Sequence, residues 1–142
     1  MKKIMTKNKR QRGFTLLEVL IAVTLLAIGL LAAASMQATA INSNGIANRI
    51  SVTSALAQEA MEDIMAWNTS DVRFAASSAG ATYDLDPATA ATSIQIPAAG
   101  TFNATYSITV NSPVNKTVTI VVTVTNAETN RQVSLTCFKR LI

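Results

Sequence analysis

The strongest constraint on the fold is a long uncharged stretch near the N-terminus. The chain carries no charged residue from Val19 to Asn48, and the segment from Phe14 to Ala34 is almost wholly apolar. About twenty helical residues span roughly 30 Å, the thickness of the hydrocarbon core of a bilayer. Only 14% of all residues are charged, about half the usual share in soluble domains. We therefore expect this segment to form a membrane-spanning helix.

The basic residues are concentrated ahead of this segment. Six of the twelve basic side chains lie in the first twelve positions, which contain no acid. Such a cluster keeps the N-terminus on the cytoplasmic side of the membrane. After Gly13, six basic residues face eight acidic ones, so the remainder is mildly acidic. Nucleic-acid binding needs cations clustered on the folded domain, and we expect no nucleic acid as a partner.

The apolar segment continues into an amphipathic one without an interruption that would end a helix. No proline occurs before Pro87. Helical spacing places a set of apolar residues on one face: Ile46, Ile50, Leu56 or Ala57, Ala60, Ile64 and Trp67. We predict a single helix from about Phe14 to Trp67.

The C-terminal part has the alternation of a sheet. Residues 68–100 are rich in Ala, Ser, Thr and Gly and are predicted to form a loose connection, with a short strand at residues 93–96. Apolar residues then alternate along three segments: Phe102 to Val110, Val118 to Val124, and Val133 to Cys137. The expected fold class is α+β, with the long helix packed on a small antiparallel three-stranded sheet.

The run Gly13-Phe14-Thr15-Leu16-Leu17-Glu18-Val19-Leu20, after a basic leader, resembles the processing site of type IV prepilins. A secretory signal differs, because its small-residue cleavage site follows the apolar run. The resemblance implies that prepilin peptidase cuts between Gly13 and Phe14 and that the new amine of Phe14 is methylated. It also implies that Glu18 pairs with the terminal amine of a neighbouring subunit, since a lone acid is costly in hydrocarbon.

This resemblance implies a division of the chain and a set of partners. Residues 1–13 would be a cleaved leader, residues 14–39 a transmembrane and filament-core helix, and residues 40–142 a periplasmic head. The head would comprise a helix at 40–67, a connection at 68–100 and a sheet at 101–139. The expected partners are major and minor pilin subunits, prepilin peptidase, the assembly platform of the inner membrane, and membrane lipid before assembly.

A second resemblance narrows the class of pilin-like protein. Residues 26–31, with Met36 and Gln37, and later residues 54–61 are similar to minor pilins of the PilV type. Major pilins usually have a proline in the membrane half of the helix and a paired-cysteine loop, and this chain has neither. The implied function is that of a minor pilin, built into or at the tip of a pilus that supports assembly, adhesion or motility. An I-type minor pseudopilin of type II secretion shares the same plan and stays open.

No cofactor, metal centre or catalytic residue is expected. The chain has no histidine and one cysteine, Cys137, which we interpret as a buried structural thiol. Asp84 and Asp86 offer too few carboxylates for calcium, which takes six to eight oxygens, and a solvated turn is favoured. A membrane-anchored enzyme lacks a nucleophile with its base. A pilin that binds DNA during uptake would require a basic patch on the folded head.

Overall fold

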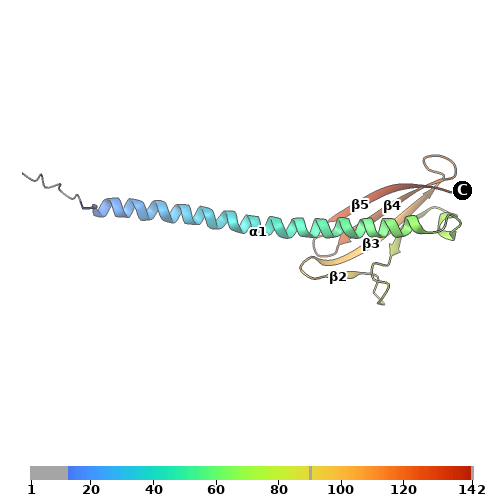
Figure 1. The fold of residues 1–142 in the computed structure, drawn as a ribbon, viewed down its shortest axis with the longest axis horizontal. Helices are drawn as coiled ribbons and strands as arrows, with labels where there is room; N and C mark the ends of the chain where they lie inside the picture. The colour runs from blue at the N-terminus through green and yellow to red at the C-terminus, as the bar shows by residue number, and fades with distance from the viewer. Residues whose placement is uncertain (1–12, 90, 142) are drawn as a thin grey trace, which may run out of the picture. The chain divides into compact units, whose positions relative to one another are not determined.

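The computed structural model describes residues 13–89 and 91–141. The predicted leader lies outside this range except for Gly13. The elements are helix α1 (Leu16–Ala66), a 3₁₀ turn η1 (Val72–Phe74), and strands β1 (Ser78–Tyr83), β2 (Ile94–Ile96), β3 (Gly100–Val110), β4 (Thr117–Asn126) and β5 (Gln132–Arg140), all drawn in Figure 1. Contacts divide the chain into two compact units, which meet between Ile41 and Asn42.

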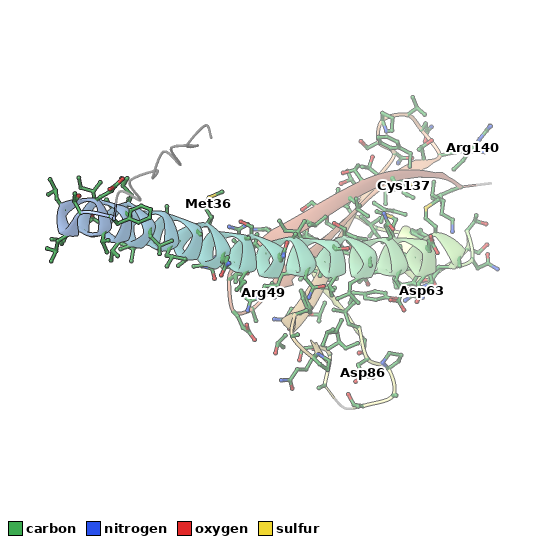
Figure 2. The ribbon with its side chains drawn as sticks, turned by 60° about the vertical axis from the view of Figure 1, so that its left-hand side comes forward. Met36, Arg49, Asp63, Asp86, Cys137 and Arg140 are labelled. Carbon is green, nitrogen blue, oxygen red and sulfur yellow. The ribbon has the colours of Figure 1, made fainter. Side chains whose placement is uncertain are left out.

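The single long helix is confirmed, with bounds within two residues of those expected. α1 has 51 residues, and none of its residues from 16 to 48 is buried. The side chain of Met36, for example, stands out from the helix and is 73% exposed (Figure 2). The first unit therefore holds its helix by backbone hydrogen bonds and presents an apolar surface all round.

The sheet of the second unit is antiparallel as expected, but it has five strands instead of three. Its order is β1-β3-β4-β5, and β2 also pairs with β3. The short strand predicted at residues 93–96 is present as β2. β1 was missed because its sequence, Ser-Ala-Gly-Ala-Thr-Tyr, has weak strand propensity and no apolar alternation. Pairing with β3 holds it in place, with a bulge between Ser78 and Ala81.

The predicted inner face of the sheet is confirmed. Alternate residues of β4 are fully buried, and β3 and β5 flank β4 in continuous antiparallel register. The core joins these strands to the helix residues that lie across them, as Figure 1 shows for the second unit. It contains Leu56, Ala57, Ala60, Met61, Ile64, Phe74, Phe102, Ala104, Ile108, Val118, Ile120, Val122 and Val124.

The helix covers the sheet over a shorter length than expected. Burial begins at Thr53, whereas Ile46 and Ile50 remain 42% and 43% exposed. The helical spacing correctly placed Ala60 and Ile64 against the sheet. Spacing fixes a face, but it does not say how far along the helix the sheet extends.

The C-terminal end of α1 is held by a lysine from β5. The last turn of the helix contains no basic residue, so its free carbonyls lack a cation of their own. Lys139, which is 9% exposed, donates from Nζ to the carbonyl oxygen of Met65 at 2.7 Å and to that of Trp67. A cation at this end also interacts favourably with the helix dipole. Lys139 thus fastens the last strand to the end of the helix.

Replacing this lysine is expected to destabilise the head. Lys139→Met should lower the free energy of unfolding by about 1–3 kcal/mol, because two helix-end carbonyls lose a charged donor. The neighbouring Arg140 is exposed and serves as the control, and Arg140→Met should change stability by less than about 0.5 kcal/mol. Thermal unfolding of the full chain in detergent, followed by circular dichroism, compares the two. Equal changes in the free energy of unfolding of the two variants would show that the hydrogen bonds from Lys139 to the helix-end carbonyls do not stabilise the head.

An aromatic cluster surrounds the same helix end. The Trp67 ring packs edge-on against Tyr106 at 5.5 Å between centroids and also contacts Phe74. The guanidinium of Arg73 lies 3.4 Å from the centre of the Trp67 ring. Arg73 also forms an ion pair with Asp71, at 2.6 Å. Its hydrogen bonds lower the pKa of Asp71 to about 2, so that the carboxylate stays charged and the pair stays intact at neutral pH. The cluster closes the core where the helix ends.

Candidate processing and assembly site

The residues expected to carry processing lie where non-helical chain becomes helix. Gly13, Phe14 and Thr15 precede the first helical residue, Leu16. The backbone N–H of Glu18 donates to Thr15 Oγ1 at 3.3 Å and to the Thr15 carbonyl at 3.1 Å. Thr15 is therefore the N-cap of α1, and Glu18 sits three residues later, the spacing of a capping box. This cap fixes where the helix begins, three residues after Gly13.

Gly13 is unconstrained by the rest of the described chain. A side chain built at this position would meet no atom within 4 Å. The fold itself therefore imposes no requirement for glycine here. To a protein that binds this segment, glycine offers an unhindered backbone.

Phe14 and Glu18 face the same groove. This groove of about 350 Å³ follows one face of the first helical turns, with Ala22 and Leu26 further along it. A second hollow at the same end is lined by Gly13, Phe14, Thr15 and Glu18. A cut behind Gly13 would thus create the new amine beside this hollow, four residues before Glu18.

Glu18 is the only charged residue on a long apolar surface. No other charge occurs between Phe14 and Asn48, and exposed apolar side chains surround it, including Phe14 (82%), Leu17 (67%) and Val19 (51%). By length and composition α1 can cross a membrane: an 18-residue window has mean hydropathy 2.6 and none of it is buried. An acid on such a surface is tolerated in hydrocarbon only with a partner.

The other candidates from the sequence form no site. Among the described residues no group of three or more Cys, Asp or Glu comes together. Asp84 accepts the backbone N–H of Asp86, and Asp86 accepts the hydroxyl of Thr89, so both carboxylates serve a loop, labelled at Asp86 in Figure 2. Cys137 is half-buried and packs at the margin of the core instead of being fully enclosed.

Thr15 was missed as a functional residue. The signal was present, because Thr15-Leu16-Leu17-Glu18 has the threonine and glutamate of a capping box. The cap gives Glu18 a second consequence, since an acid near a helix N-terminus interacts favourably with the helix dipole.

Comparison with known proteins agrees with this geometry. Residues 8–34 match the prokaryotic N-terminal methylation motif. No curated protein and no solved structure matches the chain. The match covers the N-terminal segment alone, and the motif is that of type IV pilin-like and pseudopilin-like proteins. This motif implies processing by prepilin peptidase, residence in the inner membrane before assembly, and assembly into a pilus or pseudopilus.

Proposed function

We propose that the chain is a minor type IV pilin, similar to the PilV type, that is built into or at the tip of a pilus. The observation that carries the proposal is the methylation motif at residues 8–34, which leads into an exposed apolar helix. An uninterrupted α1 without proline and the single cysteine favour a minor subunit over a major one. Its role is to support pilus assembly, adhesion or motility.

The processing we propose divides the chain at Gly13. Prepilin peptidase removes residues 1–13 by cutting between Gly13 and Phe14, and the amine of Phe14 is then methylated. The non-helical backbone and open surroundings of Gly13 suit a peptidase. Residues 14–39 then anchor the chain in the inner membrane and later line the filament core. Residues 40–142 form the periplasmic head, which becomes extracellular in the pilus.

Glu18 is proposed to set the position of each subunit. After cleavage, the basic residues of the leader are gone, and the Phe14 amine of an adjacent subunit is the available positive charge. A charge pair in apolar surroundings is strongly selective for one geometry, because a displaced subunit leaves both charges without a partner. The Glu18 carboxylate is exposed and free to make this contact, since it is not part of an ion pair among the described residues.

A minor pseudopilin of type II secretion is the second candidate. The same motif and the same helix serve both classes. The two are distinguished by the filament that contains the subunit. Recovery in sheared pili supports the pilus, and loss of protein secretion without any change in pili supports the secretion system.

Mass spectrometry of the mature protein tests the proposal. The mature chain should begin at an N-methylated Phe14. Gly13→Val should accumulate as uncut precursor in the inner membrane, because the β-branched side chain obstructs the peptidase. Val19→Leu, a change on the apolar surface, is the control and should be processed normally. A mature chain that starts at another residue, or normal processing of Gly13→Val, contradicts the proposed cut.

A further inference from the structure

The free edge of β5 offers unpaired backbone groups for an added strand. β5 is the last strand in the sheet order and pairs only with β4. At the two ends of this ladder, Leu141 N–H donates to the Lys116 carbonyl and Asn126 N–H donates to the Arg131 carbonyl. Antiparallel pairs alternate, so the odd-numbered residues of β5 bond to β4. The N–H and C=O groups of the even-numbered residues therefore point to the open edge: Gln132, Ser134, Thr136, Phe138 and Arg140.

These outward groups have no backbone partner within the described part of the chain. The nearest interaction is a weak one, from the Cys137 thiol to the Phe138 carbonyl at 3.8 Å. The side chains of the same even-numbered residues are exposed, and Phe138 is 57% exposed. Nine consecutive residues thus keep a regular, accessible edge.

The opposite edge of the sheet has the features that prevent such pairing. It is divided between β1 and β2, of six and three residues. β1 also has a bulge at Ser78–Ala81, where Gly80 adopts a positive φ of 65°. Natural edge strands are protected by short length, bulges or proline. β5 has an unbroken register with β4 and contains no proline.

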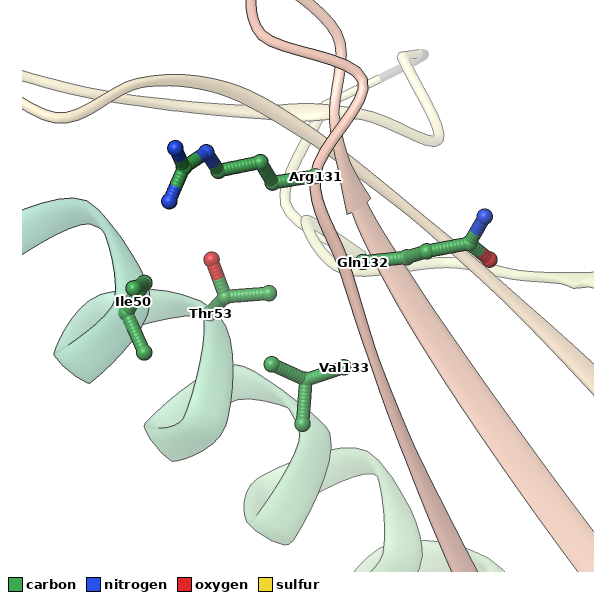
Figure 3. A pocket seen from close by; sticks show the side chains of 5 residues that line it. All are labelled: Ile50, Thr53, Arg131, Gln132 and Val133. Carbon is green, nitrogen blue, oxygen red and sulfur yellow. The ribbon is translucent and has the colours of Figure 1, made fainter. Parts of the chain in front are cut away.

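A groove at the start of β5 adds a charged end to this edge. It has a volume of about 300 Å³ and is lined by Ile50 and Thr53 from α1 and by Arg131, Gln132 and Val133 (Figure 3). Arg131 reaches over the opening, whereas Gln132 points away from the helix. The acid closest to Arg131 in sequence, Glu128, pairs with Arg49 at 3.4 Å instead. The groove therefore combines an apolar floor with an available cation.

The charges along β5 identify the kind of strand that would fit. From Asn130 to the end of the chain there are three basic residues and no acid. Two β5 strands in full antiparallel overlap would set Leu141 of one copy opposite Arg131 of the other, so a second copy would supply no acid for this cation. We propose that β5 accepts an extended, acid-bearing strand from a different protein, with an acidic side chain at Arg131. This inference rests on the head alone and does not depend on processing at Gly13.

A proline substitution can block the free edge of β5 without disturbing the pairing of β5 with β4. Thr136→Pro removes an outward N–H but leaves every β4–β5 hydrogen bond, and edge strands tolerate proline at such positions. The probe is a fluorescent strand-forming peptide of alternating valine and threonine with glutamate at both ends. Its binding to the full chain in detergent micelles is measured by anisotropy. Thr136→Pro should weaken binding by about tenfold or more, whereas Thr136→Ala should bind as the unaltered chain does.

Charge reversal provides the second comparison. Arg131→Glu should weaken binding of the glutamate peptide and strengthen binding of a matched lysine peptide. No binding to the unaltered chain overturns the proposal, and so does equal binding by a correctly folded Thr136→Pro variant or equal affinity for both peptides. Analytical ultracentrifugation tests whether a second copy of this chain occupies the edge instead. Dimers of the unaltered chain that Thr136→Pro dissociates would show that a second copy fills the edge, contrary to the proposal.

Discussion

Glu18→Val is expected to leave the chain inserted, processed and folded, yet to reduce its recovery in filaments by about tenfold or more. The substitution removes the only charge on the apolar surface of the first unit. On the proposed pairing, the Phe14 amine of the adjacent subunit would then have no partner in apolar surroundings, and no charge pair would distinguish one subunit position from another. The head should be unaffected, because the described residues that form its core or pack against it begin at Val52.

The measurement is the amount of subunit in sheared filaments relative to the amount in membranes. Glu18→Asp is the matched variant, since it keeps the charge and shortens its reach by one methylene; its recovery should be intermediate. Thr15→Ala separates the two roles of this region, because it removes the N-cap and keeps the acid. It should weaken the first turn by about 1 kcal/mol and still assemble. Wild-type recovery of Glu18→Val in filaments would remove Glu18 from the mechanism.

Val122→Asp should unfold the head or cost on the order of 3–5 kcal/mol of its stability. Val122 is fully buried at the centre of the sheet, opposite Tyr106 on β3 and Leu135 on β5. A carboxylate there has no cation to pair with and must be desolvated. Thermal unfolding of the full chain in detergent should show the loss as a much lower midpoint.

The adjacent residue supplies the control for this prediction. Thr123 lies on the other face of β4, where its hydroxyl shares a hydrogen bond with Ser134 at 2.8 Å. Thr123→Asp should cost less than about 1 kcal/mol, because the new charge stays in solvent. Equal destabilisation by the two substitutions would contradict the register of β4.

Much of this fold could be predicted from periodicity. The alternation from Val118 to Val124 specified both strand and buried face, because a shift of one residue would turn the four buried residues, Val118, Ile120, Val122 and Val124, into solvent. The helix was predictable because no proline interrupts it before Pro87. β1 could not be predicted, because it is held by pairing with β3, about 25 residues further along the chain. Gly80 also weakens the strand propensity of the β1 sequence. The limit of helix coverage at Thr53 likewise depends on where the sheet ends.

The candidate site, like the fold, could be predicted only in part from the sequence. Gly13, Phe14 and Glu18 could be proposed from their order in the sequence, but the structure adds the Thr15 cap and the groove that Phe14 and Glu18 share. Lys139 and the open edge of β5 could not be proposed from the sequence. A lysine one residue from an exposed arginine gives no sign that its amine is enclosed, and an edge strand has the same alternation as an inner one. Both features depend on which elements become neighbours.

The Lys139 contact also orders events during folding. The carbonyls that it satisfies precede it by 74 and 72 residues, so the end of α1 cannot be completed until β5 has been synthesised and has joined the sheet. Closing so long a loop costs entropy that no local contact repays. The membrane segment, by contrast, forms from neighbouring residues as soon as it emerges. Insertion can therefore precede maturation of the head, and a subunit waits in the bilayer, already anchored, while its last strand closes the fold.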